Sequence, residues 1–137
     1  MPAVRGILET SLYVADLERS AAFYQRLFGF SDLIREERMC ALNVVDRHVL
    51  LLFKVGGSTE PTETPDGTIP PHDGHGTLHI AFAIATEEMD DWRERLHEQG
   101  ITIESEMHTE RGGHSIYFRD PDGHLLEFVP PHLWPIY

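Results

Sequence analysis

The sequence lacks the features that mark secreted, membrane-spanning and nucleic-acid-binding proteins. Its single cysteine, Cys40, excludes an internal disulfide and is typical of a reducing compartment. No apolar run approaches the roughly 20 residues that a membrane helix needs. The first residues contain no apolar signal region, so we expect a cytoplasmic protein. Only 11 Lys and Arg residues oppose 23 Asp and Glu residues, and a net charge of −12 argues against binding to nucleic acid or to an anionic membrane.

What the sequence does contain is one pattern that occurs twice. In the first copy, residues 7–15 alternate between apolar and polar side chains, as in a half-buried strand. Asp16 is a good N-cap for the helix that follows, and we expect that helix to end at Gly29. Further strands are expected near residues 31–37, 39–46 and 48–55.

The second copy begins at Leu78. Residues 78–85 alternate in the same way, Thr86 is the expected N-cap of a helix, and Gly100 is its expected end. This repetition predicts an α+β fold of two βαβββ modules. The expected strands of the second copy lie near residues 101–107, 114–119 and 124–130, with module 1 at 5–56, module 2 at 77–131 and a joining loop at 57–76.

Superimposing the two copies brings four positions into correspondence. Glu9 and His79 each follow a leucine at the start of the opening strand. In the closing strands DRHVLLLF matches DGHLLEFV, which places Leu51 over Glu127. Carboxylate and imidazole donors from separate segments suit one divalent ion per site, Mn²⁺, Fe²⁺, Ni²⁺ or Zn²⁺. We therefore predict a metal site formed by Glu9, His79 and Glu127, with room left for water or substrate.

Each predicted ligand also has an ordinary structural explanation. Glu127 could be a strand residue that faces solvent, and His79 could be a hydrogen-bonded core histidine. Glu9 could be an edge charge that discourages aggregation. The placement of all three at positions related by the repeat favours the metal hypothesis.

The last predicted hairpin, SIYFRDPDGHLLEF, supplies candidates for substrate binding. Ser115 and Tyr117 share a face, and Tyr117 or its neighbour should pair across from Glu127. The Tyr117 hydroxyl could bind substrate or act as an acid. Arg119 and Arg111 could hold a substrate carboxylate. Three further histidines could add a ligand or a base: His72, His75 and His114.

Three stretches of the chain together resemble the vicinal oxygen chelate superfamily: SLYVADLERSAAFYQRLFGF, GTLHIAFAI and SIYFRDPDGHLLEF. This superfamily includes glyoxalase I, bleomycin-resistance proteins, extradiol dioxygenases and fosfomycin-resistance enzymes. The resemblance covers nearly the whole chain. It implies a single glyoxalase-like domain over residues 1–137, with a curved mixed sheet of half-barrels around a metal site, helices on the outside, and a homodimer.

The resemblance also implies roles for individual residues. His79 and Glu127 match the second-module metal ligands, whereas Glu9 falls where many members carry His or Gln. Leu51 falls near the fourth metal ligand of glyoxalase I. Ser115 and Tyr117 match substrate-contacting positions of the fosfomycin-resistance enzymes.

From these features we expect a metal-dependent enzyme that acts on a small oxygen-rich metabolite or xenobiotic, as a lyase or isomerase or as a dioxygenase. The ion would chelate adjacent substrate oxygens and stabilise an enolate or alkoxide. Glu9, Glu127 or Tyr117 would carry the proton transfer. The alternative is a metal-free protein of the bleomycin-resistance type that sequesters a cationic drug, which the negative net charge would favour.

Overall fold

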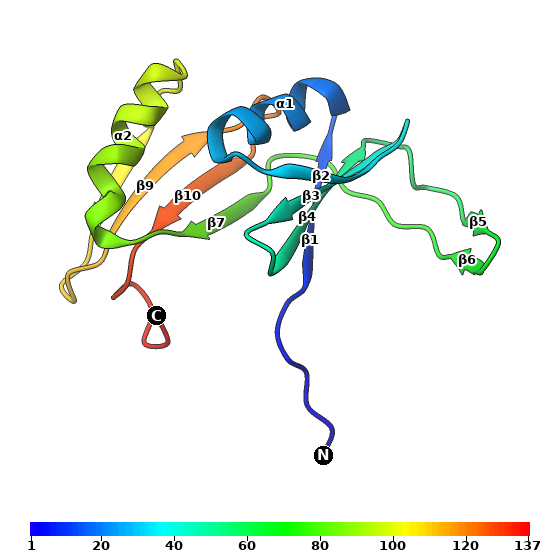
Figure 1. Cartoon of the computed structure of the whole chain (residues 1–137), viewed down its shortest axis with the longest axis horizontal. Helices are drawn as coiled ribbons and strands as arrows, with labels where there is room; N and C mark the ends of the chain where they lie inside the picture. The colour runs from blue at the N-terminus through cyan, green and yellow to red at the C-terminus, as the bar shows by residue number, and fades with distance from the viewer. The chain divides into compact units, whose positions relative to one another are not determined.

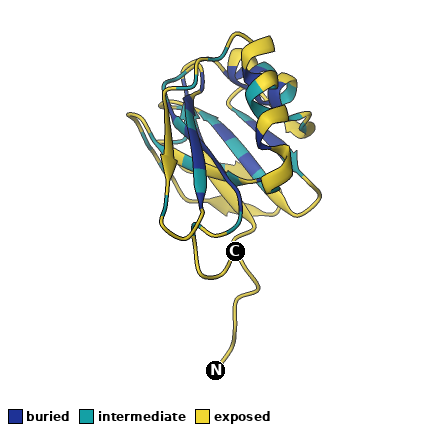
Figure 2. Cartoon of the chain, turned by 90° about the vertical axis from the view of Figure 1, so that its left-hand side faces the viewer, coloured by how far each residue is buried: buried dark blue, intermediate teal, exposed yellow.

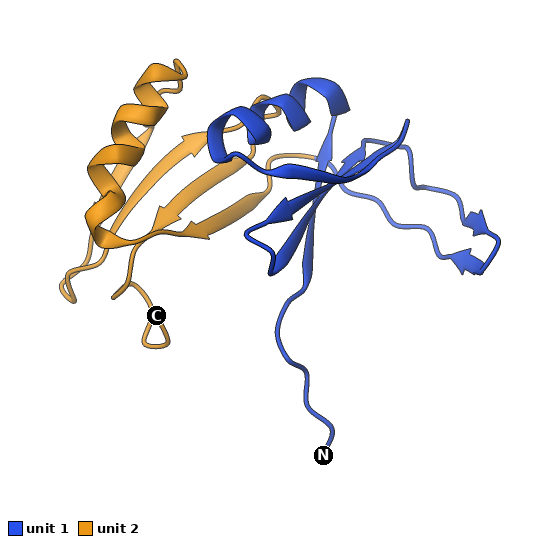
Figure 3. Cartoon of the chain, in the orientation of Figure 1, with its two compact units in different colours: residues 1–75 blue, residues 76–137 orange.

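The computed structural model describes all 137 residues, and these divide into two compact units, residues 1–75 and 76–137 (Figure 3). Each unit contains one long helix and a four-stranded sheet, so the predicted α+β architecture is confirmed (Figure 1). No helix has the length and apolar character needed to cross a membrane.

The first unit follows the predicted order of strand, helix and three strands. Its sheet has the strand order β1-β4-β3-β2, in which β1 runs parallel to β4 and the other neighbours are antiparallel. These elements are β1 (Glu9–Val14), α1 (Leu17–Phe28), β2 (Ser31–Arg35), β3 (Met39–Val44) and β4 (His48–Lys54).

Helix α1 begins and ends where the sequence predicts. The Asp16 side chain accepts a hydrogen bond from the backbone N–H of Arg19 at 3.1 Å, which satisfies one of the free amides of the first turn. Gly29 adopts a left-handed conformation with φ of 75° and closes the helix. One stripe of the helix is buried, and α1 packs against β3 and β4 through these residues: Leu17, Ser20, Ala21, Phe23, Tyr24 and Leu27.

The second unit repeats this topology. Its sheet has the order β7-β10-β9-β8, again with one parallel pair, β7 with β10, and antiparallel pairs elsewhere. The matching order and strand directions confirm the internal repeat. The elements are β7 (His79–Ala83), a 3₁₀ turn η1 (Thr86–Glu88), α2 (Met89–Glu98), β8 (Ser105–His108), β9 (His114–Arg119) and β10 (Leu125–Val129).

The prediction that Thr86 caps the second helix is wrong. Thr86 starts the 3₁₀ turn, Glu88 directly precedes α2, and no side chain caps that helix. Asp90 and Asp91 lie in its first turn, where negative charge interacts favourably with the helix dipole and reduces the need for a cap. Gly100 follows the helix with φ of 68° and donates to the carbonyl of His97, as expected of a helix terminator.

Two strand predictions also differ from the structure. The strand expected over 101–107 begins only at Ser105. The expected loop 57–76 contains a short hairpin of β5 (Thr62–Thr64) and β6 (Gly67–Ile69). Its turn is closed by the Thr64 hydroxyl, which donates to the Gly67 carbonyl at 2.7 Å. The TPDG sequence is a turn signal that explains this hairpin in hindsight.

Buried residues lie on the strands of both sheets and on the helices, while the N-terminal segment is exposed (Figure 2). Cys40 belongs to this core and is fully buried. Burial raises the pKa of its thiol to about 11, so the reactive thiolate is scarce at neutral pH. We expect a thiol reagent such as DTNB to label Cys40 only after denaturant is added. Rapid labelling of the native protein, followed by absorbance, would contradict this burial.

Candidate metal and substrate site

The strand register of the second unit places the two predicted ligands on one face. On the parallel pair β7 and β10, His79 lies opposite Leu125 and Glu127 lies opposite Ala81. On the antiparallel pair, Tyr117 lies directly opposite Glu127, as the hairpin register predicts. Side chains two residues apart on a strand share a face, so these residues line one surface of the sheet.

The first unit has the same register. Glu9 lies opposite Val49, and Leu51 lies opposite Ser11, two residues further along each strand. Glu9 therefore corresponds to His79 and Leu51 to Glu127, which confirms the superposition drawn from the sequence. Glu9 is an exposed residue at the start of β1, and its role as a ligand stays a prediction.

Packing on the opposite face of the second sheet explains why Glu127 points away from α2. Its neighbours Leu126 and Phe128 are fully buried, and the Phe128 ring lies 4.7 Å from Trp92 of α2 and 4.8 Å from Phe118. Because strand side chains alternate, burying these two residues beneath α2 forces Glu127 onto the other face. Its small neighbour Ala81 leaves room there for a ligand.

The His79 imidazole is held with one nitrogen available. Its Nδ1 lies 2.9 Å from the carbonyl oxygen of Leu125. A carbonyl can only accept, so Nδ1 carries the proton, and in the neutral ring Nε2 has a free lone pair. That Nε2 lies 3.2 Å from Oε2 of Glu127. Two acceptors at this distance repel each other unless a proton or a metal ion lies between them.

The other carboxylate oxygen of Glu127, Oε1, also lacks a hydrogen-bond partner. The side chain is 7 % exposed, and its Oε1 is buried without any hydrogen-bond partner. A buried carboxylate is costly unless it is paired or binds a cation. The Ser115 hydroxyl on the neighbouring strand is likewise buried and unpartnered. These polar atoms fit a divalent cation and the polar groups of a ligand.

Tyr117 is kept protonated by its surroundings. Burial raises the pKa of its phenol, and the neighbouring Glu127 carboxylate raises that pKa further. The hydroxyl is therefore a hydrogen-bond donor across the physiological pH range.

A buried hairpin motif fixes the strand that carries His79. His124 is 1 % exposed, and its Nδ1 accepts a hydrogen bond from the backbone N–H of Leu78 at 2.9 Å. Asp120 in turn accepts from the backbone N–H groups of Asp122 and His124, both at 2.9 Å. The DPDGH turn thus anchors the residue that directly precedes His79.

We expect His124→Ala to lower the free energy of unfolding by about 2 kcal/mol, because it leaves the Leu78 amide unpaired and opens a cavity. Urea denaturation followed by circular dichroism measures this loss. His97→Ala, on the exposed part of α2, is the matched control and should change stability little. Equal stability of the two variants would contradict the anchoring role.

The two arginines proposed for substrate binding are differently placed. The Arg119 guanidinium donates to both carboxylate oxygens of Glu104, at 2.7 and 3.0 Å, and to the Gly123 carbonyl. A substrate carboxylate would have to compete with Glu104 for it. Arg111 lies exposed in the turn that precedes β9. Substrate binding by either residue stays a prediction.

A contact that the sequence hardly signals lies on the Glu9 face of the first unit. The Tyr13 hydroxyl and His72 Nδ1 are 2.7 Å apart, and the His72 ring packs edge-on against Phe53 at 4.4 Å. A side chain at Gly74 would overlap the Tyr13 ring. The only sequence signal for a defined position of His72 is the pair of prolines that precedes it. The contact fastens the segment that contains β5 and β6 to β1 and β4.

We expect His72→Ala to loosen this segment and to speed its limited proteolysis about fivefold, the factor that one hydrogen bond of roughly 1 kcal/mol provides. Gly74→Val should act in the same direction because the new side chain would meet Tyr13. His75→Ala is the control, since His75 is exposed nearby. Unchanged cleavage rates in both variants would contradict the proposed anchor.

Comparison with known proteins identifies the family. Residues 6–128 match the Glyoxalase/Bleomycin resistance protein/Dioxygenase superfamily. The chain belongs to this superfamily. This confirms the resemblance drawn from the three sequence stretches.

Among curated members of the superfamily, the chain is 32 % identical over 124 residues to the glutathione transferase FosA of Serratia marcescens, covering 90 % of this chain and 79 % of that one. It is 32 % identical over 127 residues to the metallothiol transferase FosB of Lysinibacillus sphaericus, covering 91 % and 82 %. These relatives are enzymes, and they place the chain in the enzyme-containing part of the superfamily.

Two solved structures of superfamily members are also similar. The lactoylglutathione lyase of Agrobacterium tumefaciens has a TM-score of 0.88 and 29 % identity, covering 98 % of this chain and 99 % of that one. The fosfomycin resistance protein FosX of Listeria monocytogenes, solved with Mn(II) and sulfate, has a TM-score of 0.70 and 26 % identity, covering 96 % and 94 %.

Proposed function

We propose that this protein is a divalent-metal-dependent enzyme that acts on a small molecule with adjacent oxygen atoms. The observation that carries the proposal is the pair formed by His79 Nε2 and Glu127 Oε2, which lie 3.2 Å apart, next to the unpartnered Glu127 Oε1. We retain Glu9 as the proposed third ligand because it is the repeat counterpart of His79.

The donor set fits a cation such as Mn²⁺, Fe²⁺, Ni²⁺ or Zn²⁺, since it combines carboxylate oxygen with imidazole nitrogen. Leu51 occupies the position that corresponds to Glu127, so the repeat supplies three ligands and no fourth. When bound, the cation would act as a Lewis acid that favours negative charge on a substrate oxygen.

The residues around this pair would bind and orient the substrate. Tyr117 stands across from Glu127 as a permanent donor, so it can hydrogen-bond a substrate oxygen or deliver a proton. The buried Ser115 hydroxyl has no partner within the protein and is available to a polar substrate group.

For the reaction, we propose a proton transfer at a carbon next to a substrate carbonyl or hydroxyl, which is lyase or isomerase chemistry. One carboxylate, Glu9 or Glu127, would accept the proton and Tyr117 would stabilise the charge that develops on oxygen. The similarity to the A. tumefaciens lactoylglutathione lyase over nearly the whole chain supports this class.

A second candidate is the opening of a strained oxygen-containing ring, as in fosfomycin, which carries an epoxide and a phosphonate. The FosA and FosB relatives and the placement of Ser115 and Tyr117 on the ligand face support it. In this case a thiol or water would form a bond to a ring carbon, the C–O bond of that carbon would break, and Tyr117 would donate a proton to the oxygen released. Both candidates require the same metal site.

The test begins with the metal. Purified protein is stripped with a chelator, reloaded separately with each of the four ions, and analysed for metal content. We expect one Mn²⁺ per chain, absent from a Glu127→Gln variant, with activity restored by one or more of the four ions. The loaded protein is then assayed with α-hydroxycarbonyl compounds and with epoxides in the presence of glutathione, another thiol or water alone.

Less than one ion per chain after reconstitution would overturn the metal-dependent function. Full activity of the stripped protein would overturn it as well. If the loaded protein turned over the epoxides but none of the α-hydroxycarbonyl compounds, the lyase or isomerase reaction would be wrong and ring opening would be the favoured function.

A further inference from the structure

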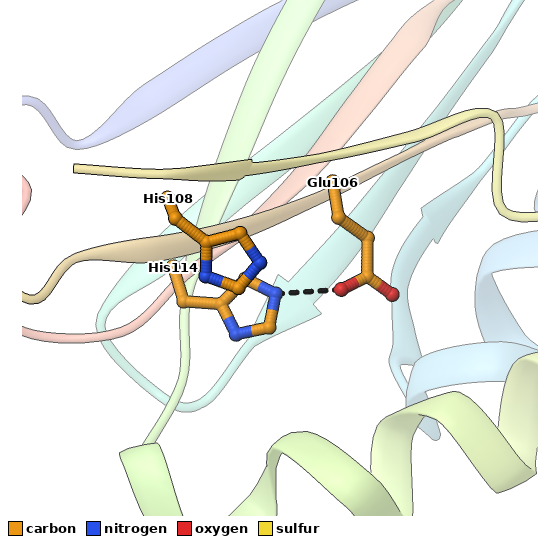
Figure 4. A group of neighbouring side chains, drawn as sticks. All are labelled: Glu106, His108 and His114. Carbon is orange, nitrogen blue, oxygen red and sulfur yellow. Dashed lines mark hydrogen bonds and ion pairs between the residues drawn. The ribbon is translucent and has the colours of Figure 1, made fainter.

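A second group of metal-binding side chains lies on the opposite face of the second sheet, next to α2. Glu106, His108 and His114 each offer one ligand atom, and these atoms lie within 4.8 Å of one another (Figure 4). None of them belongs to the His79 and Glu127 site. We propose that they form a separate binding site for a divalent metal ion of the zinc type.

The strand register brings these three residues together. His108 at the end of β8 lies directly opposite His114 at the start of β9, and Glu106 lies two residues before His108 on the same face of its strand. Glu106 also pairs with Ile116, whose side chain is fully buried on the helix side. Since Glu127 faces away from α2, one β-sheet separates the two sites.

The three side chains already contact one another. His114 Nε2 and Glu106 Oε2 form a hydrogen bond of 2.6 Å, and the rings of His108 and His114 stack with centroids 3.9 Å apart (Figure 4). Small side-chain rotations would bring two imidazoles and one carboxylate around a common point. The turn between His108 and His114 is closed by Thr109, whose hydroxyl accepts from the Gly113 N–H and whose N–H donates to the Gly113 carbonyl.

The donor chemistry distinguishes this site from the first. Two imidazoles and one carboxylate favour Zn²⁺, Ni²⁺ or Cu²⁺ over the harder Mn²⁺ and Mg²⁺. The first proposed site has two carboxylates and one imidazole and is therefore more tolerant of hard ions. A titration with zinc should fill both sites, whereas manganese should favour the first.

Arg93 of α2 acts as a built-in competitor for the ion. Its guanidinium donates to both oxygens of Glu106, at 3.1 and 2.9 Å, and lies 3.3 Å from His114 Nε2. It also donates to Asp90 at 2.5 Å. A metal ion would replace the Arg93 contacts to Glu106, and Arg93 could keep its bond to Asp90. The site should therefore bind more weakly than its ligand set alone would allow.

The experiment uses Zn²⁺ alone on the full chain, in a His79→Ala and Glu127→Gln background that disables the first site. Equilibrium dialysis gives the stoichiometry and affinity, and Co²⁺ absorption reports the ligand geometry. We expect one ion per chain. His108→Ala and His114→Ala should each weaken binding by more than about 100-fold, because even the loss of an outer partner of a metal ligand costs about 10- to 100-fold.

Two control variants sharpen the test. His97→Ala removes an exposed histidine of α2 outside the cluster and should leave zinc binding unchanged. Arg93→Gln should tighten binding about fivefold, the upper range of what a surface ion pair contributes. Circular dichroism establishes that each variant is folded.

Absence of saturable zinc binding in the background variant would overturn the second site. Binding that survives both His108→Ala and His114→Ala would overturn the ligand assignment. Weaker binding in Arg93→Gln would overturn the role of Arg93 as a competitor.

Discussion

Replacing Glu127 by glutamine should abolish metal binding at the first site and, at the same time, stabilise the metal-free protein. The carboxylate is buried, one of its oxygens has no partner, and the other faces the lone pair of His79 Nε2. A glutamine amide of the same shape could donate to that nitrogen and would remove a buried charge. We expect the free energy of unfolding of the metal-free protein to rise by about 1 kcal/mol.

The same substitution removes an anionic ligand, so the affinity for Mn²⁺, which should bind mainly at this site, should fall by more than about 100-fold. Thermal unfolding measured with and without Mn²⁺ shows both effects. The wild-type protein should gain stability from the ion, and the Glu127→Gln variant should not. Glu104→Gln is a useful control, because Glu104 directly precedes β8 and its carboxylate is paired with exposed Arg119.

The opposite pattern would contradict the account. If Glu127→Gln lost stability without metal and kept the metal-induced rise in melting temperature, Glu127 would be a structural residue rather than a ligand.

Replacing Tyr117 by phenylalanine should lower kcat by about 100-fold or more with little change in metal affinity, since a positioned acid or donor contributes about 10²- to 10⁴-fold. The hydroxyl lies on the ligand face opposite Glu127, and its raised pKa keeps it protonated. The substitution keeps the ring and its packing. The measurement is a steady-state assay with the substrate identified from the panel, paired with a metal titration.

A second variant separates chemistry from binding. Ser115→Ala removes a hydroxyl proposed to orient the substrate, so it should raise KM more than it lowers kcat. Unchanged kcat in Tyr117→Phe would exclude Tyr117 as an acid. Loss of bound metal in that variant would instead point to a role in shaping the metal site.

The sequence predicts this face of the second unit well, because the information is local. Leu126 and Phe128 flank Glu127 as an alternating strand requires, and the DPDG turn sets the pairing of Tyr117 with Glu127. The match between the two copies then relates Glu9 to His79 and Leu51 to Glu127 without any knowledge of side-chain positions.

Features that depend on contacts between residues far apart in the chain are harder to predict from the sequence. The partner of Tyr13 is His72, which lies 59 residues away on a loop that gives no periodic signal. Thr86 has the side chain of a good N-cap, yet the acidic residues of the first helical turn make that cap dispensable.

The sequence does not predict the cluster of Glu106, His108 and His114, for a related reason. The sequence points to His114 as a possible ligand, but Glu106 and His108 acquire significance only through the register of β8 against β9. That register depends on where β8 begins, and the strand starts at Ser105 rather than near residue 101. Arg93 joins the cluster from α2, which no local pattern indicates.

A crystal structure of the Mn²⁺-loaded protein, with anomalous diffraction data, tests directly whether His79 and Glu127 hold the metal ion. We expect an anomalous peak about 2.0–2.4 Å from His79 Nε2 and from a carboxylate oxygen of Glu127, the usual range of such bonds. A fully loaded crystal whose anomalous peaks all lie away from these two side chains would show that they are not the metal ligands.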